Sequence, residues 1–257
     1  MTALQRTLRT EVTVVTAVIP AAGLGTRVRE VAGEQPKEML SVGGKPLIQV
    51  VVEEALAAGI RRIAVVVRPG KESIRECLMA KPGIGAELVF PVQPKPLGVV
   101  DALACARPFL GEKPFVMILP DQGLLAARSA TAQLLAAWQP GPTIWSALVR
   151  IPSADIHCFP GARAVRLGRW INPVAREVHG FAKPGGENGR QAVRAIGRTV
   201  LPPAIFDHLG GSVDDLAAIY TRSGLPHHAI VLAGEPWDLG TVDGYRRFEP
   251  AVAAFHG

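Results

Sequence analysis

The chain has 257 residues, of which 48% are hydrophobic and only 5% aromatic, so a sizeable core can form mainly from aliphatic side chains. No apolar run approaches the roughly 20 residues of a membrane helix, and residues 1–11 lack the apolar core and cleavage pattern of a signal peptide. The net charge is +6, but the basic residues are scattered without interleaved aromatics, which favours small anionic substrates over nucleic acid. We therefore expect a cytoplasmic protein that binds neither nucleic acid nor a membrane, with a flexible extension over residues 1–11.

The first half of the chain alternates strand and helix patterns. A nearly continuous β-branched run over residues 12–20 predicts a buried central strand. Residues 46–58 are apolar at helical spacing and end before Gly59, a residue suited to a helix C-cap. This alternation is typical of a doubly wound parallel sheet. Further strands are predicted at residues 63–67, 86–90 and 115–119, and further helices at residues 71–79 and 99–106.

After Pro120 the pattern is less regular, and residues 153–172, rich in Arg, Gly and Pro, receive no assignment. Neither an internal repeat nor a long linker interrupts the chain. We predict a single α/β domain over residues 12–257, with a doubly wound, mostly parallel, Rossmann-like mixed sheet flanked by helices and a small substrate-binding lobe in its later half. The later elements are predicted as helices at residues 128–138, 202–209, 213–221 and 242–255, and as strands at residues 143–150, 191–200 and 228–232.

A glycine-bearing loop, residues 21–27 (AAGLGTR), follows the first predicted strand directly. Glycines let backbone N–H groups approach phosphate oxygens, and Thr26 and Arg27 add further donors. An ordinary tight turn would have the same composition, so the loop alone leaves both interpretations open. Val28 stands where a dinucleotide-binding loop needs its third glycine, which disfavours a nicotinamide oxidoreductase. The Walker motif, which needs Gly-Lys-Ser/Thr at the end of the loop, is absent as well.

The next segment, residues 35–40 (QPKEML), places Lys37 behind a proline and a short loop away from Arg27, where both could meet one triphosphate. Together, residues 17–40 (AVIPAAGLGTRVREVAGEQPKEML) resemble the signature of the sugar-phosphate nucleotidyltransferase family, above all of bacterial UTP–glucose-1-phosphate uridylyltransferases. Glu30 is a departure, because the family often has proline there. The resemblance implies that Arg27 and Lys37 hold the leaving pyrophosphate. It also implies nucleotide contacts by Ala21, Ala22, Gly23, Gly25, Thr26 and Glu38.

Residues 93–98 (QPKPLG) are similar to the base-reading segment of the related thymidylyltransferases. By that resemblance, Gln93 hydrogen-bonds the nucleobase edge and Gly98 lets the base lie against the backbone. An amide both donates and accepts, which suits the imide edge of a pyrimidine, although a polar loop residue would look the same. UTP is the favoured donor, followed by dTTP, and GTP remains open.

Two aspartates are candidate metal ligands. Asp121 ends the predicted strand at residues 115–119, at the edge where open α/β sheets bind ligands, although a helix N-cap is the alternative. The family's first metal aspartate lies in this Leu-Pro-Asp context, and residues 237–241 (WDLGT) resemble its second metal-binding segment. The resemblance therefore implies that Asp121 and Asp238 bind Mg²⁺, and their convergence rests on it alone.

Residues 180–184 (GFAKP) resemble the family's sugar-phosphate segment, which implies phosphate contacts by Gly180 and Lys183. The family's glutamate, an acceptor for sugar hydroxyls, is replaced here by Ala182. Two hypotheses follow. Either the acceptor is a modified sugar or a cyclitol phosphate, or Asn172 or Glu177 supplies the missing acceptor to ordinary glucose 1-phosphate.

The implied reaction is an in-line attack by a sugar 1-phosphate on the α-phosphorus of a nucleoside triphosphate, with release of pyrophosphate. Residues 12–125 would form the nucleotide half and residues 126–257 the sugar-phosphate half of a homo-oligomer, a dimer or a tetramer. The alternatives are a non-catalytic nucleotide- or sugar-phosphate-binding protein, for which Ala182 is the main support, and a GTP-using nucleotidyltransferase of specialised metabolism. The implied catalytic set is Arg27, Lys37, Asp121, Lys183 and Asp238, with Mg²⁺ as cofactor.

Overall fold

The fold was analysed in a computed structural model that describes residues 14, 16–81, 85–182, 193–210 and 215–256. The predicted extension and Lys183 lie outside this part of the chain. Within it, no helix is long and apolar enough to cross a membrane.

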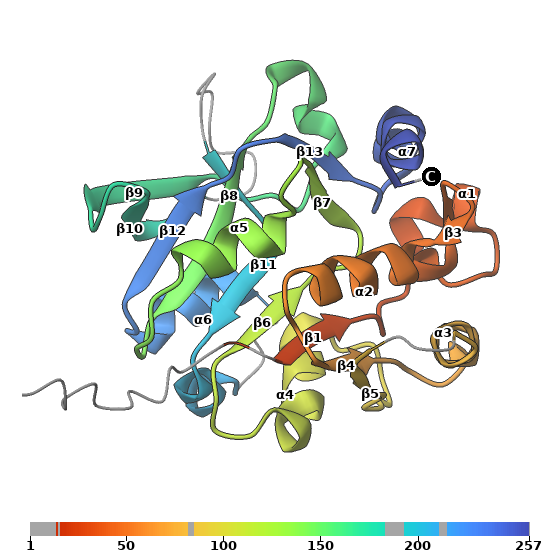
Figure 1. Cartoon of the computed structure of the whole chain (residues 1–257), viewed down its shortest axis with the longest axis horizontal. Helices are drawn as coiled ribbons and strands as arrows, with labels where there is room; N and C mark the ends of the chain where they lie inside the picture. The colour runs from red at the N-terminus through yellow and green to blue at the C-terminus, as the bar shows by residue number, and fades with distance from the viewer. Residues whose placement is uncertain (1–13, 15, 82–84, 183–192, 211–214, 257) are drawn as a thin grey trace, which may run out of the picture.

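A nine-stranded sheet runs through both halves of the chain (Figure 1). Strands β5, β4, β1 and β6 pair in parallel, β11 lies antiparallel between β6 and β8, and β12 is parallel to β8. Strands β10 and β9 complete the far edge in antiparallel pairings. In spatial order the strands are β5 (Glu87–Val89), β4 (Arg62–Val66), β1 (Thr16–Pro20), β6 (Phe115–Ile118), β11 (Val193–Leu201), β8 (Ile144–Arg150), β12 (His227–Val231), β10 (Ala175–Phe181) and β9 (Val165–Trp170).

Helices cover both faces of the sheet because successive strand residues point to opposite sides. Ala17 and Ile19 join one core cluster, whereas Val18 joins another on the opposite face. The first cluster is closed by α2 (Leu47–Ala57), α3 (Glu72–Met79), α5 (Ala130–Ala137) and α7 (Val242–His256), and the second by α4 (Val99–Leu110), α6 (Leu216–Ser223) and the 3₁₀ turn η4 (Pro203–His208). The predicted doubly wound, mostly parallel sheet is therefore confirmed (Figure 1).

Short elements carry the loops near the predicted site. The glycine loop leads into η1 (Thr26–Val28) and α1 (Arg29–Ala32), and the Lys37 segment forms η2 (Lys37–Met39). A hairpin of β2 (Ser41–Val42) and β3 (Lys45–Pro46) precedes α2. A further 3₁₀ turn, η3 (Ser153–Cys158), lies before β9.

A second sheet that the hydrophobic pattern did not predict joins two distant segments. Strand β7 (Gln122–Leu125) follows Asp121 immediately and pairs antiparallel with β13 (Glu235–Asp238). The register places Asp238 opposite Gln122. Through this pairing, the two predicted metal aspartates come to the same end of the main sheet.

Some predicted boundaries differ from the structure. Part of the unassigned Arg/Gly/Pro-rich region forms β9, and α4 continues past its predicted end to Leu110 with Pro108 inside it. The helix predicted at residues 202–209 is only the 3₁₀ turn η4, Pro203–His208.

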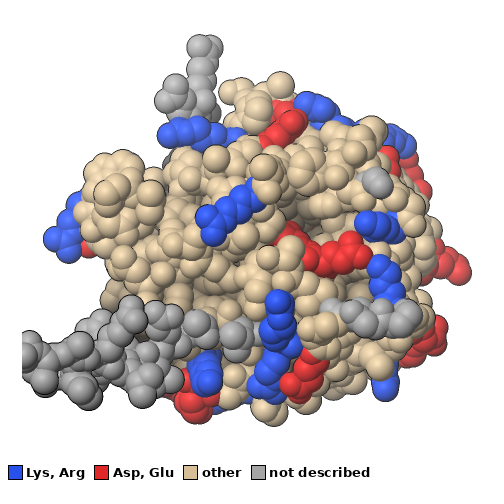
Figure 2. All heavy atoms as spheres, viewed as in Figure 1, with Lys and Arg blue, Asp and Glu red and all other residues tan. Residues whose placement is uncertain are grey.

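Charged side chains are interspersed on the visible face of the molecule. Figure 2 shows Lys and Arg side by side with Asp and Glu, without a continuous basic band. On this face, the positive net charge is therefore dispersed rather than concentrated as in a surface for a nucleic-acid backbone.

Candidate active site

The glycine loop packs directly against the lysine segment. Gly25 adopts a left-handed conformation with φ 69°, and a Cβ added there would lie 3.4 Å from the Cβ of Lys37. Glycine therefore satisfies both the backbone conformation and the close approach. A cavity of ≈360 Å³ opens above the loop at the carboxyl ends of β1 and β6. Its lining includes Ala22, Gly23, Gly25, Thr26, Arg27, Lys37, Gln93, Gly98 and Asp121.

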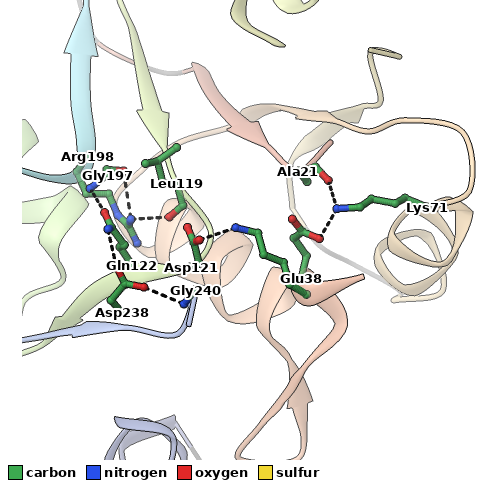
Figure 3. Close-up of polar contacts among 11 residues, drawn as sticks. Ala21, Glu38, Lys71, Leu119, Asp121, Gln122, Gly197, Arg198, Asp238 and Gly240 are labelled. Carbon is green, nitrogen blue, oxygen red and sulfur yellow. Dashed lines mark hydrogen bonds and ion pairs between the residues drawn. The ribbon is translucent and has the colours of Figure 1, made fainter. Parts of the chain in front are cut away.

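The two predicted metal aspartates converge at the edge of this cavity (Figure 3). Leu239 donates its backbone N–H to the carbonyl of Asp121 at 2.8 Å, and Gly240 donates its own to Oδ1 of Asp238 at 2.8 Å. A Cβ added at Gly240 would lie 2.6 Å from Oδ2 of Asp121 and 3.0 Å from Oδ1 of Asp238. Both carboxylates therefore face the same small space, which a side chain at position 240 would fill.

The protonation of the two aspartates is set by different neighbours. Burial alone would raise the pKa of Asp121, but the Lys37 ammonium, 2.5 Å from its Oδ2, outweighs burial and lowers that pKa. Burial also opposes the charge on Lys37, yet Asp121 and Glu38 together raise its pKa above the usual value. Burial and the nearby Asp121 charge raise the pKa of Asp238 to about 6. The pair thus has excess negative charge that a cation would relieve.

This arrangement fits a divalent metal ion. Mg²⁺ commonly takes one or two protein carboxylates and fills its other positions with phosphate oxygens and water. Asp121 and Asp238 offer that number of ligands beside a phosphate-sized cavity. Within the described ranges, no group of three or more His, Cys, Asp or Glu side chains gathers as a metal-binding cluster.

Glu38 lies behind the glycine loop instead of among the residues lining the cavity. Its fully buried carboxylate accepts a hydrogen bond from Lys71 at 2.7 Å, and Lys71 also donates to the carbonyl of Ala21 at 2.7 Å. The Lys71–Glu38 ion pair therefore holds the carbonyl of Ala21, at the start of the glycine loop, in place (Figure 3). Sequence reasoning missed Lys71, because a single lysine before a helix carries no pattern that distinguishes it from a surface residue.

Gln93 has an orientation fixed by its neighbours. Its Nε2 donates to the carbonyl of Gly98 at 2.9 Å and to Oδ2 of Asp101 at 2.7 Å. Both N–H groups of the Gln93 amide are thus engaged. Because the acceptors are a carbonyl and a carboxylate oxygen, the amide nitrogen, and not its oxygen, faces Gly98 and Asp101. Contact of Gln93 with a base in this orientation would use its oxygen as an acceptor.

A second chamber adjoins the first on the later half of the chain. Its volume is ≈210 Å³, and it shares Arg27, Leu119 and Asp121 with the first cavity. The junction between the chambers therefore lies beside one of the two aspartates and a guanidinium. The remaining lining includes Ser146, Gly161, Arg163, Phe181, Thr199, Asp215 and Tyr220.

Of the two residues predicted to bind the sugar phosphate, only Gly180 lies in the described part of the chain. Gly180 lines a further cavity beside α6, which shares Phe181 and Tyr220 with the second chamber, and Lys183 lies outside the described residues. Glu177 pairs with Arg169 at 2.8 Å and lines this further cavity, while Asn172 caps its own exposed turn by accepting from the backbone of Val174 and Ala175. Neither Glu177 nor Asn172 lines the second chamber.

A buried network holds the aspartates from behind. Gln122 donates from Nε2 to Oδ2 of Asp238 at 2.8 Å and accepts from the backbone N–H of Gly197 at 2.9 Å. Arg198 donates to the carbonyl of Leu119 at 2.8 Å and pairs with Glu54 of α2 at 2.7 Å. Sequence reasoning missed this network because its members come from segments far apart in the chain.

The fold defines a class of protein, an α/β protein with a Rossmann-like sheet, and its two adjoining chambers offer room for two ligands beside a carboxylate pair. Residues 16–146 match the model of the nucleotidyl transferase family. The UTP–glucose-1-phosphate uridylyltransferase of Streptococcus pyogenes is 33% identical over 276 residues, covering 93% of this chain and 89% of that protein. The enzyme of the same name from Bacillus subtilis is 28% identical over 264 residues, covering 89% and 87%.

A solved structure of a UDP-glucose pyrophosphorylase complexed with UDP-glucose has the same fold. It matches with a TM-score of 0.79 and 25% identity, covering 93% of this chain and 98% of that one. The chain therefore belongs to the nucleotidyl transferase family, and it is a sugar-1-phosphate nucleotidyltransferase.

Proposed function

We propose that the protein transfers a uridylyl group from UTP to glucose 1-phosphate or a closely related ring, and releases pyrophosphate. The observation that carries this proposal is that Asp121 lines both chambers and that its carboxylate faces that of Asp238 across the space at Gly240. The relatives named for UTP and glucose 1-phosphate support the choice of substrates. The nucleotide would lie in the chamber of the glycine loop and the sugar phosphate in the chamber beside it.

The reaction needs alignment and charge neutralisation more than proton transfer. An oxygen of the sugar phosphate, already anionic, attacks the α-phosphorus, and the bond from that phosphorus to the bridging oxygen breaks as pyrophosphate leaves. Arg27 lines both chambers, so its guanidinium can contact phosphates of both substrates. Lys37 presents its ammonium beside Asp121 and is proposed to hold the leaving pyrophosphate. Lys183 is proposed to hold the attacking phosphate.

Asp121 and Asp238 are proposed to hold Mg²⁺, which would neutralise phosphate charge when bound. The residues behind them keep this pair in place. Gln122 fixes one carboxylate oxygen of Asp238, and the N–H of Gly240 fixes the other. The chain's own contribution is thus a pair of preorganised, buried acceptors, one of which, Asp121, lines both chambers.

The direct test is pyrophosphate release by purified protein with each of the four ribonucleoside triphosphates and dTTP, combined with glucose 1-phosphate and Mg²⁺. We expect UTP to give the highest kcat/KM, dTTP to be next, and EDTA to abolish turnover. Preference for GTP would replace the proposed donor, and unchanged turnover in EDTA would remove the metal from the proposal.

Asp121→Asn should lower kcat by at least about a hundredfold, the scale of losing a principal electrostatic stabiliser. Asp207→Asn is the matched control, because Asp207 has an exposed side chain and lies outside both chambers. Equal activity of the two variants in the pyrophosphate assay would exclude Asp121 from the reaction.

A further inference from the structure

The second chamber contains an ion pair that the transfer step itself does not need. Arg163 Nη2 lies 2.8 Å from Asp215 Oδ2, and both residues line the chamber. Their side chains are 32% and 35% exposed, so the two charges face the chamber without being fully open to solvent. Arg163 comes from the connection before β9, and Asp215 is the N-cap of α6.

Each member of the pair is held by the fold independently of the other. Asp215 uses its second oxygen, Oδ1, to accept the backbone N–H of Ala217 at 3.0 Å. The backbone carbonyl of Arg163 accepts the N–H of Ala195 on β11 at 3.0 Å. The pair is therefore a preorganised feature of the chamber wall, and a substrate finds it already formed.

The pair also lies near the junction of the chambers. Gly161, two residues before Arg163, is so close to Arg27 that an added Cβ would lie 4.0 Å from its Nη1. A ring whose phosphate contacts Arg27 would therefore extend along the wall that carries Arg163 and Asp215.

Apart from Arg27 and Asp121 at the junction, the rest of the chamber is neutral. Ser146 and Thr199 contribute buried hydroxyl groups, and Ser146 Oγ lies 2.8 Å from Nε2 of His227. Burial lowers the pKa of His227 to about 3, so the imidazole adds no charge at physiological pH. Apolar side chains complete the lining: Met117, Leu119, Phe181, Ile196 and Leu216.

An ion pair of this kind discriminates between neutral and charged ring substituents. A hydroxyl group can donate to Asp215 and accept from Arg163 while the two charges stay together. An ammonium or carboxylate substituent would compete for one partner and leave the other without compensation in a partly buried place, which is costly.

We infer that Arg163 and Asp215 bind the ring hydroxyls of the acceptor, and that the acceptor is the 1-phosphate of a neutral polyhydroxylated ring, not of an amino sugar or a uronic acid. This inference rests on the proposed function. It supplies an acceptor for sugar hydroxyls in a chain that has Ala182 in the segment expected to provide one. Asn172 and Glu177, the residues first considered for that purpose, lie elsewhere.

The test compares Arg163→Gln and Asp215→Asn with the wild type, using UTP and three acceptors: glucose 1-phosphate, glucosamine 1-phosphate and glucuronic acid 1-phosphate. Asparagine keeps an oxygen to cap α6, so the fold is preserved. The matched control is Arg169→Gln with Glu177→Gln, a pair at the same 2.8 Å distance outside the chamber.

The wild type should prefer glucose 1-phosphate to both charged acceptors. Each variant should lose about ten- to hundredfold in kcat/KM for glucose 1-phosphate, as expected for a hydrogen bond to a charged group, while its KM for UTP stays within about twofold of the wild type, as for a change confined to the acceptor chamber. Arg163→Gln should shift preference toward the ammonium-bearing acceptor, and Asp215→Asn toward the carboxylate-bearing one. These shifts are ratios within one variant, so they do not depend on the amount of folded protein.

Acceptor kinetics that match those of the control pair would overturn the inference while leaving the proposed function intact. So would a wild type that prefers a charged acceptor, or variants whose preference does not shift in opposite directions. A wild type that releases no pyrophosphate with any triphosphate and acceptor would instead overturn the proposed function, and this inference with it.

Discussion

Asp238 illustrates how a single side chain at the site works against the stability of the metal-free protein. Its carboxylate is buried beside a second carboxylate, and among the described residues only Gln122 and the N–H of Gly240 donate to it. These donors do not offset burial and the Asp121 charge, so the pKa is raised to about 6. The unfolded value is near 3.9. Folding therefore favours the protonated form of Asp238.

The sign of the resulting pH dependence follows from this raised pKa. The contribution of protonated Asp238 to the free energy of unfolding is fully present below pH ~4 and is lost as the pH rises through about 6. Relative to Asp238→Asn, the metal-free wild type should gain about 1–1.5 kcal/mol in free energy of unfolding between pH 7.5 and pH 5. Urea denaturation at several pH values measures this difference. Saturating Mg²⁺ should remove it, and parallel pH curves for the two metal-free proteins would contradict it.

Gly240 provides a steric test of the same place. Its φ lies outside the left-handed region, so alanine is acceptable to the backbone there, but the new Cβ would meet both carboxylates. Gly240→Ala should raise the Mg²⁺ concentration needed for half-maximal activity at least about tenfold, the effect of disturbing metal-ligand geometry. Gly210→Ala, where an added Cβ meets nothing within 4 Å, should leave that concentration unchanged. Equal metal requirements in both variants would show that this space does not hold the ion.

At the scale of elements, a buried ion pair joins three parts of the fold. Arg198 of β11 is fully buried and pairs with Glu54 of α2, whose Oε1 also accepts from the backbone and hydroxyl of Thr131 on α5. Burial works to raise the pKa of Glu54, but the guanidinium and the Thr131 hydrogen bonds lower it overall. The pair therefore fixes two helices against the strand that supports Leu119.

Arg198→Met should reduce the free energy of unfolding by about 3–5 kcal/mol, because it leaves the Glu54 charge buried and unpaired. The double variant with Glu54→Gln should recover much of that loss. In an equivalent cycle at the surface, Arg62 and Glu87, 2.8 Å apart, should couple by less than about 1 kcal/mol. Urea denaturation of both cycles decides the matter, and coupling energies of similar size would refute the role assigned to burial.

The central strands could be predicted from sequence because they are buried on both faces and are therefore almost entirely apolar and rich in β-branched residues. The short strands β7 and β13 could not, since one begins with Gln122 and the other contains Pro236, and neither shows alternation over enough residues. Strand β9 was hidden by its two arginines and a glycine. These strands are defined by their partners, which a local pattern does not reveal.

The candidate site, too, was predictable from the sequence only in part. Local sequence indicated the glycine loop and the carboxylate at the end of a strand, and the structure places both at one cavity. The approach of Asp238 to Asp121 was implied by family resemblance alone. The positions of Lys71, Arg163 and Asp215 depend on long-range packing, and no spacing in the sequence marks them.

At the scale of the whole molecule, net charge bears on how substrates arrive. Both proposed substrates are anions, and the protein has a formal net charge of +6. Arg29 and Arg68 line a further cavity behind the glycine loop, whose lining includes a single acidic residue, Glu34, while its two lysines, Lys37 and Lys71, are already in ion pairs. Such a local excess of positive charge attracts anions over a distance that salt shortens.

We expect kcat/KM for UTP to fall severalfold between 50 and 500 mM KCl, with a smaller change in kcat, because salt screens the approach of the substrate more than a buried contact. Arg68→Gln should weaken this dependence, whereas Arg107→Gln, on the exposed surface of α4, should not. Identical salt profiles for the two variants would argue against local attraction. The homo-oligomer, a dimer or tetramer, stays a prediction that sedimentation velocity can test.

The pairing of β7 with β13 has a consequence for how the enzyme is made. Gln122 and Asp238 are 116 positions apart, so at ordinary rates of translation the second strand is synthesised roughly 6–23 s after the first. During that interval the nascent chain already contains the glycine loop, Lys37 and Asp121, but β7 has a free edge open to other strands. Before Asp238 has been synthesised, Lys37 alone compensates the charge of Asp121. We therefore expect a ribosome-bound intermediate to bind nucleotide before it can catalyse transfer, which needs both aspartates.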